Sequence, residues 1–280
     1  MLSFLITVYI LIIVSLYYNT SINVIQMNSN LIRYIIAAII FSIHLSCSTN
    51  TKLKSVETSM IELNAQTSLT DKEFEKTLDP YKSKMDRIMN ELLIISEQPL
   101  LKGLPESTLG DFASDAILKK TNDNYKPADN IPVNICLLNN GGLRAELPKG
   151  DITRGNAFEL MPFENSIFIL TISGEKTKQL FDYIVQNNGA PFGGATIKAK
   201  GKKITELKIS GQDFDINKTY KIATSDYLAA GGDKYYFFKD PIKTEILKYK
   251  LRDAIIDYMI EENKKGNTLK VSTDGRIKYE

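Results

Sequence analysis

Two glycine-rich segments, each directly after a short apolar run, constrain the fold of this chain most. "NNGGLR" (139–144) follows the apolar residues 132–138, and "SDYLAAGGD" (225–233) follows 220–224. Short apolar runs bounded by glycine are typical of buried β-strands. Ligand sites in open α/β sheets lie just beyond strand ends, so we expect both segments to face one crevice.

The remaining pattern alternates strands and helices. Further strands are expected at "SIFILTIS", in a hairpin around Gly201-Lys202 and at the C-terminus; helices are expected over 79–96, 105–120, 173–189 and 244–266. Asp79 is the expected N-cap of the first helix and Pro80 its first residue. This mixture predicts an α+β fold, a layered α/β/α sandwich with a mixed sheet, as one domain over 70–280.

The composition excludes several classes of function. A net charge of +2 provides no basic field, so a nucleic-acid polymer is not an expected partner. The only histidine is His44, which leaves no histidine in 70–280 for a catalytic triad or a His-rich zinc or two-metal centre. Cys136 lies in the apolar run "PVNICLLN" and is predicted to be a small buried hydrophobic residue.

The N-terminus carries two apolar runs, 2–18 and 31–47. The second has the layout of an export signal: Arg33, an apolar stretch, then small residues before Cys47. It resembles a bacterial lipoprotein signal, in which Cys47 is the lipidated residue. His44 departs from that pattern, which has leucine or a similar residue there. A pair of membrane-spanning helices is the alternative.

A start at Met27 gives this signal a normal length. The expected organisation is a hydrophobic N-terminal segment with a lipoprotein signal (1–47), a polar tether (48–69) and the folded domain (70–280). We therefore expect an exported protein anchored to a membrane by lipid, in the periplasm or at the cell surface.

The two glycine-rich segments and the residues between them contain the groups that a nucleotide needs. A guanidinium can hold phosphate, a carboxylate can accept hydrogen bonds from ribose, aromatic rings can stack on a base, and amides can bind base edges. Glycines let the backbone approach a ligand closely. The candidate substrate-binding residues are Asn139, Gly141, Gly142, Arg144, Phe163, Asn165, Tyr227, Gly231, Gly232 and Asp233.

The segments "NNGGLRAELPKGDITRGNAFELMPFEN" and "YKIATSDYLAAGGDKY" resemble the C-terminal domain of the 5'-nucleotidase family. "PESTLGDFASDAIL" is similar to a helix of the same domain, and the resemblance covers roughly 70–280. It implies that Phe163 and Tyr227 enclose a nucleoside base, with Asn139 and Asn165 near its edges. It also implies that Asp233 binds the ribose and that Arg144 lies near the phosphate.

This sequence departs from the family pattern at two places. A second phosphate-binding arginine is replaced by Pro105, and Lys102 is the nearest cation in the sequence. Glu164 stands where the family has glycine, which predicts a carboxylate beside the base site.

The family's catalytic half is a metallophosphoesterase domain with a two-metal cluster of Asp, His and Asn, and we find no such cluster in this sequence. We therefore expect no catalytic residue and no metal site in this chain, with divalent metals supplied by a separate metallophosphatase. The leading hypothesis is the substrate-binding half of a split 5'-nucleotidase, inactive alone. The alternatives are a non-catalytic, membrane-anchored lipoprotein that binds nucleotides or nucleosides, and a domain that has lost its ligand.

Overall fold

The fold was analysed in a computed structural model that describes residues 72–280. The predicted signal, the lipidation at Cys47 and the polar tether fall outside the described residues. Within 72–280, every helix is too short or too polar to cross a membrane.

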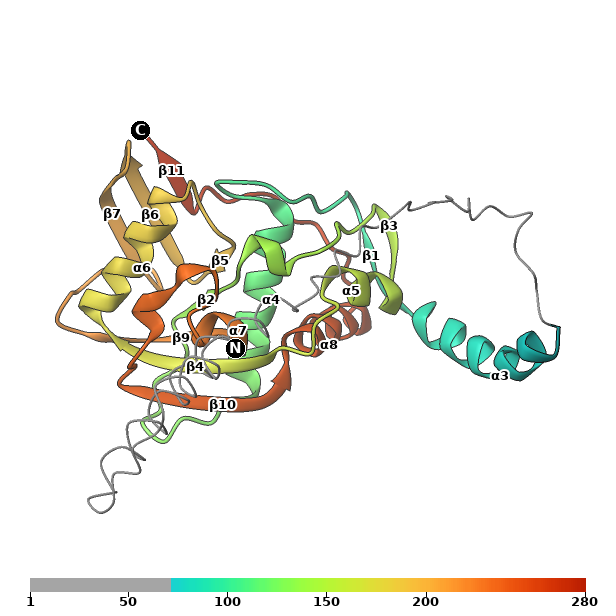
Figure 1. The fold of residues 1–280 in the computed structure, drawn as a ribbon. Coiled ribbons are helices and arrows are strands. Elements are labelled where there is room, and N and C mark those ends of the chain that lie inside the picture. Colours follow the sequence, from blue (N-terminus) through green and yellow to red (C-terminus); the bar gives the residue numbers. More distant parts are fainter. Residues whose placement is uncertain (1–71) are drawn as a thin grey trace, which may run out of the picture. The chain divides into compact units, whose positions relative to one another are not determined.

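A five-stranded mixed sheet forms the centre of the described domain (Figure 1). Its order is β10 (Lys243–Lys250), β4 (Ser166–Ser173), β9 (Thr219–Ser225), β2 (Ile135–Leu137) and β5 (Phe192–Gly193). Only the neighbours β2 and β9 are parallel; the other pairs are antiparallel. The two parallel strands therefore end at the same edge of the sheet.

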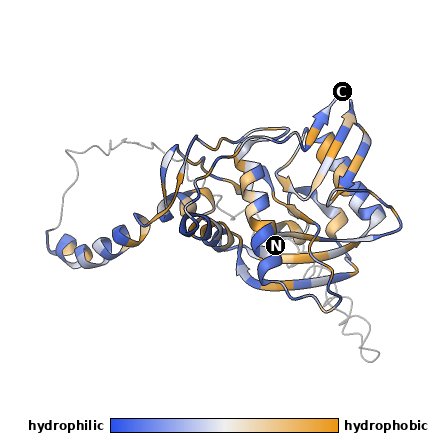
Figure 2. Cartoon of the chain, turned by 180° about the vertical axis from the view of Figure 1, so that it is seen from behind, coloured by the Kyte–Doolittle hydropathy of each residue, from blue (hydrophilic) through white to orange (hydrophobic). Residues whose placement is uncertain are grey.

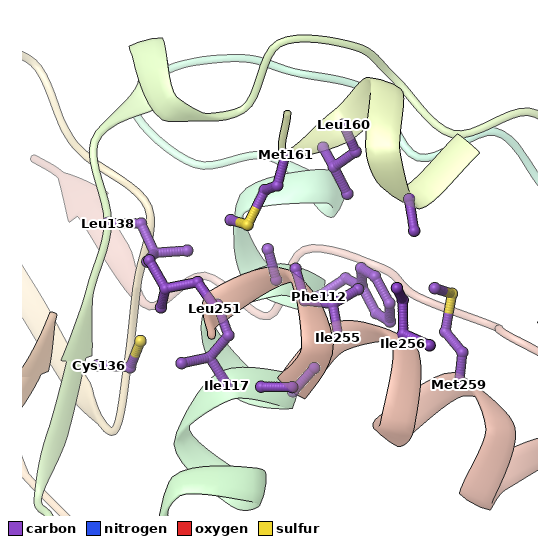
Figure 3. Packing of buried hydrophobic residues seen from close by; sticks show 14 of the residues in the cluster. Phe112, Ile117, Cys136, Leu138, Leu160, Met161, Leu251, Ile255, Ile256 and Met259 are labelled. Atoms are coloured by element: carbon purple, nitrogen blue, oxygen red, sulfur yellow. The ribbon is translucent and has the colours of Figure 1, made fainter. Parts of the chain in front are cut away.

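Helices cover both faces of this sheet. The helices α4 (Thr108–Asn124) and α8 (Leu251–Lys264) pack on one face, and α6 (Gly174–Gln186) packs on the other. Because strand side chains alternate, Cys136 and Leu138 join the α4–α8 cluster (Figure 3), whereas Ile135 and Leu137 join the α6 cluster. The predicted α/β/α sandwich is confirmed, and Cys136 is fully buried as expected.

A second, four-stranded sheet has the order β11 (Ile277–Tyr279), β6 (Ala195–Lys200), β7 (Lys203–Ile209) and β8 (Gln212–Asp213). It contains the predicted hairpin, in which Gly201 adopts the left-handed φ of 59° that the turn requires. The C-terminal strand β11 pairs in parallel with β6, also as predicted.

Two of the predicted helices begin at a serine cap. Ser107 caps α4 by accepting a hydrogen bond from the Gly110 amide at 3.1 Å. Ser173 caps α6, which ends before Asn188 and Gly189, both with positive φ. These short-range signals fix where helices start and stop.

The predicted helix over 79–96 is wrong in its bounds. The helix α3 (Lys72–Met89) contains Pro80 in its interior and buries none of its residues; Figure 2 shows it as mostly hydrophilic. Residues 92–96 instead form β1 (Leu92–Ser96), which pairs with β3 (Gly150–Thr153) and buries Leu93 and Ile94. Pairing of this apolar run with β3 outweighs the helical spacing.

The predicted helix over 244–266 is wrong in its first seven residues. Residues 243–250 are the edge strand β10, and only α8, from Leu251 onward, is helical. In β10, Glu245, Leu247 and Tyr249 are half-buried while Ile246 is exposed, so the burial alternates with period two. The helical spacing continues into this strand, but the strand's own alternation follows its pairing with β4.

Candidate functional site

A cavity of about 360 Å³ lies beyond the ends of β2 and β9, where the two glycine-rich segments meet. The expected crevice is therefore present. Every predicted site residue except Gly231 and Gly232 lies on its wall, joined by Ser225, which the sequence analysis did not single out. The wall consists of Asn139, Gly141, Gly142, Arg144, Phe163, Asn165, Ser225, Tyr227 and Asp233.

Asp233 is the hydrogen-bonding centre of the cavity. Its Oδ2 accepts a hydrogen bond from Asn139 Nδ2, and its Oδ1 accepts one from the Tyr227 hydroxyl, both at 2.7 Å. The Tyr183 hydroxyl donates to the backbone oxygen of Asp233 at 2.9 Å. The aspartate itself has a left-handed φ of 48°. The carboxylate is thus held in one orientation while its side chain remains exposed.

Gly231 and Gly232 shape the loop rather than line the cavity. Gly231 has a φ of 90°, which a residue with a side chain rarely adopts. A Cβ on Gly232 would lie 2.5–2.7 Å from atoms of the Tyr227 ring. The ring therefore rests directly against the backbone of Gly232, and only glycine leaves it that room.

The other glycine-rich segment forms a short 3-10 turn, η1 (Asn140–Gly142), directly after Asn139. A Cβ on Gly142 would lie 2.7 Å from Asn139 Oδ1, so this glycine makes room for the asparagine side chain. The backbone amide of Arg144 donates to Leu160 O at 2.8 Å, and the Arg144 residue is exposed. The guanidinium carbon of Arg144 lies 6.0 Å from the centre of the Phe163 ring.

The loop that carries Phe163 is anchored by α8. Arg252 is buried, donates to Met161 O at 3.1 Å and forms an ion pair with Glu164. Its positive charge and its hydrogen bond lower the pKa of Glu164. Lys250 donates to the backbone oxygen of Glu164 at 2.7 Å.

The side chain of Glu164, expected beside the base site, is paired with Arg252 and is not among the residues that line the cavity. Pro105 and Lys102 also lie away from the wall, so Arg144 is the only cation among the lining residues.

Asn165 and Ser225 are fixed by the short helix α7 (Asp226–Ala229). Asn165 Nδ2 donates to Asp226 Oδ1 at 2.5 Å. Ser225 is the N-cap of α7 and accepts the Leu228 amide at 3.1 Å. A serine between an apolar strand and a helical segment is a recognisable cap signal, and this signal could have identified Ser225.

The cavity offers three kinds of contact. Phe163 and Tyr227 are each 49% exposed, which leaves ring surface available for stacking. Asp233 offers carboxylate oxygens, and Arg144 offers a planar cationic fork. The hydrogen bond to Asp233 raises the pKa of Tyr227, so its hydroxyl stays protonated at neutral pH. The ligand role of each residue stays a prediction.

Sequence comparison places the chain among known proteins. Residues 101–240 match the family described as "5'-nucleotidase, C-terminal domain". The trifunctional nucleotide phosphoesterase protein YfkN of Bacillus subtilis is 30% identical, over 74% of this chain and 15% of that protein. The NAD 5'-nucleotidase of Haemophilus influenzae is 25% identical, over 75% of this chain and 39% of that protein. The chain thus spans well under half the length of these relatives.

The fold agrees with solved structures. The 5'-nucleotidase precursor from Thermus thermophilus superposes with a TM-score of 0.61 at 22% identity, over 73% of this chain and 42% of that one. Haemophilus influenzae NAD nucleotidase superposes with a TM-score of 0.55 at 21% identity, over 75% of this chain and 41% of that one. At these identities the structures support the fold alone. Since the family match spans half of the sequence, the chain belongs to the 5'-nucleotidase family through its C-terminal domain.

Proposed function

We propose that the cavity binds a nucleoside or nucleotide, with the base between Phe163 and Tyr227, the ribose hydroxyls on Asp233 and the phosphate at Arg144. The observation that carries this proposal is the gathering of two half-exposed rings, a fixed carboxylate and one exposed guanidinium around 360 Å³. Each group matches a different part of a nucleotide. Asn139 and Asn165 are proposed to bind the base edge.

We propose further that this domain is the substrate-binding half of a split 5'-nucleotidase. Residues 72–280 contain no histidine, so the Asp, His and Asn cluster implied by the family does not fit the residues described here. Divalent metals bound by a metallophosphatase chain would supply the hydroxide for phosphate-ester hydrolysis. The residues of this domain hold and orient the nucleotide.

Calorimetry of the full chain with AMP and adenosine tests the binding proposal. AMP should bind more tightly than adenosine, and Arg144→Met should remove about 1.5–3 kcal/mol from AMP binding alone. Arg154→Met is the matched control, because Arg154 is paired with Glu91 at 2.6 Å and does not line the cavity. Equal affinity for both ligands in the unchanged protein would show that Arg144 holds no phosphate.

Phosphate release from AMP tests the split-enzyme proposal. The chain alone, supplied with Mg²⁺ or Mn²⁺, should release none, and addition of a candidate metallophosphatase should start the reaction. The same Arg144→Met change should then raise KM for AMP. Hydrolysis by the purified chain alone would overturn the proposal. Binding without hydrolysis in every combination would favour the non-catalytic lipoprotein.

We also propose that the protein is exported and held at a membrane by lipid on Cys47. The basis is the apolar run 31–47 with Arg33 before it and small residues around the cysteine. Intact mass spectrometry of the membrane fraction should show a chain that begins at a diacylated Cys47. Cys47→Ser should abolish both the lipid mass and the processing before residue 47; an unprocessed N-terminus in the unchanged protein would contradict the anchor.

A further inference from the structure

A carboxylate cluster joins helix α4 to the C-terminal segment. Asp111 lies in the first turn of α4 and Asp115 one turn later, while Glu106 precedes the helix and Asp274 precedes β11. The buried Arg276 lies among them. This cluster shares no residue with the nucleotide cavity.

Arg276 neutralises only part of this negative charge. Its Nε lies 3.2 Å from Asp111 Oδ1, and its Nη2 lies 2.8 Å from both Asp115 Oδ2 and Asp274 Oδ2. Glu106 forms no ion pair with it and instead accepts the Gly275 amide at 2.8 Å. Within residues 72–280, no other lysine or arginine lies within 4.0 Å of these four carboxylates. One guanidinium thus faces four acidic side chains.

The second oxygen of Asp111 lacks a partner. Asp111 is 3% exposed, and its Oδ2 is buried with no hydrogen-bond donor among the described residues. A buried carboxylate oxygen without a donor is uncommon in folded proteins and indicates a missing cation or proton.

The geometry suits a hard divalent cation. Glu106, Asp111 and Asp274 each place one oxygen within 4.8 Å of the others. Ca²⁺ takes six to eight oxygen ligands at about 2.3–2.6 Å in flexible geometry, whereas Mg²⁺ demands a near-ideal octahedron at about 2.0–2.1 Å. A polar cavity of about 280 Å³ adjoins Asp111 and Asp274 and has room for water ligands. The set offers oxygen alone, without the nitrogen or sulfur that zinc prefers.

We propose that Glu106, Asp111 and Asp274 form a binding site for one Ca²⁺ ion, which ties the start of α4 to the segment before β11. The ion binds the unpartnered Oδ2 of Asp111 and balances the negative charge that Arg276 does not neutralise. Because β11 pairs with β6, the ion stabilises the attachment of the second sheet to α4. Its role is structural and independent of the nucleotide cavity.

Calcium binding to the full chain, after treatment with EDTA and dialysis, tests this site. Equilibrium dialysis should find about one saturable Ca²⁺ per chain, and the midpoint of thermal unfolding should rise with CaCl₂. Mg²⁺ should bind more weakly. Asp111→Asn and Glu106→Gln should each weaken Ca²⁺ binding by at least about tenfold. The absence of saturable binding in the unchanged protein would overturn the proposal.

Asp115→Asn is the matched control, because Asp115 pairs with Arg276 but is not one of the three proposed ligands. It should keep Ca²⁺ affinity within about threefold. Equal losses in Asp115→Asn and Asp111→Asn would show that charge density, not coordination, attracts the ion, and would refute the site. Circular dichroism in EDTA should show that Asp111→Asn and Glu106→Gln are both folded, which separates lost metal binding from failed folding.

Discussion

The hydroxyl of Tyr227 donates a 2.7 Å hydrogen bond to Oδ1 of Asp233. The ring proposed to stack on a base and the carboxylate proposed to bind ribose are therefore linked before any ligand arrives. The hydroxyl is not needed for stacking, because phenylalanine stacks equally well; its contribution is the hydrogen bond to Asp233. Preorganisation of this kind reduces the entropy lost when a ligand binds.

Tyr227→Ala and Tyr227→Phe should separate the ring from its hydroxyl. Loss of the ring in Tyr227→Ala should weaken adenosine binding by about 1–3 kcal/mol. Tyr227→Phe keeps the ring and loses one hydrogen bond, so it should cost at most about 1 kcal/mol. Calorimetry at neutral pH provides both values. Equal losses in the two variants would mean that the tyrosine contributes through Asp233 and not through stacking.

Two adjacent glycines should respond differently to a single methyl group. A Cβ on Gly142 would lie 2.7 Å from Asn139 Oδ1, and a Cβ on Gly141 would meet nothing closer than 3.6 Å. Gly142→Ala should therefore displace Asn139 from Asp233 and weaken adenosine binding, whereas Gly141→Ala should leave it within about 0.5 kcal/mol of the unchanged protein. Circular dichroism establishes that both variants fold. A larger loss of adenosine binding in Gly141→Ala than in Gly142→Ala would contradict the role of Gly142 in making room for Asn139.

Much of the fold was predictable because local signals and tertiary packing agree. Ser107 and Ser173 cap helices where their spacing indicates, and "SIFILTIS" is a buried strand. The predicted helix bounds are wrong where local signals and tertiary packing disagree. Leu92 and Ile95 continue a helical spacing, yet the run 92–96 pairs with β3 across more than fifty residues of sequence. Such a distant partner is invisible to a local pattern.

Most residues that line the site could be predicted from the sequence, but the contacts between their side chains could not. Two strand ends carrying glycine-rich segments place Asn139 and Asp233 at one edge of the sheet, and the parallel pairing of β2 with β9 makes this possible. The pairing of Glu164 with Arg252, 88 residues apart, had no sequence signal. The gathering of Glu106, Asp111 and Asp274 likewise depends on the fold of the C-terminal segment.

Arg252 should contribute more to the stability of the fold than Glu164, its partner in the ion pair that anchors the Phe163 loop. It is 5% exposed, donates to Met161 O and stacks 3.9 Å over Phe158, whereas the side chain of Glu164 is 68% exposed. Arg252→Met leaves a buried carbonyl unpaired and should lower the free energy of unfolding by about 1–3 kcal/mol. Glu164→Gln should change it by less than about 1 kcal/mol.

Urea unfolding measures the free energy of unfolding of both variants, and calorimetry measures their affinity for adenosine. Because the loop positions Phe163, Arg252→Met should also weaken adenosine binding. A greater loss of stability in Glu164→Gln than in Arg252→Met would contradict the assignment of the anchor to the buried arginine.

The helix pair α4–α8 should show acid-dependent stability through Glu261. Its carboxylate accepts Lys265 Nζ at 2.7 Å and Lys120 Nζ at 3.1 Å, and these hydrogen bonds lower its pKa from 4.5 to about 2. A carboxylate with a depressed pKa in the folded state stabilises the fold above its unfolded pKa, and this contribution is lost as the pH falls through the folded value. Glu261→Gln removes it at every pH.

The gap in unfolding temperature between the unchanged protein and Glu261→Gln should therefore be widest at neutral pH and narrow as the pH falls from 4.5 toward 2. Added salt should narrow it as well, because the Glu261 carboxylate is only half-buried and salt screens its attraction to the two lysines. Glu175→Gln is the control, since Glu175 also lies on a helix and forms no ion pair with any residue of 72–280. Thermal unfolding followed by circular dichroism measures the gap, and a gap that stays constant on acidification would mean that Glu261 contributes through packing instead of charge.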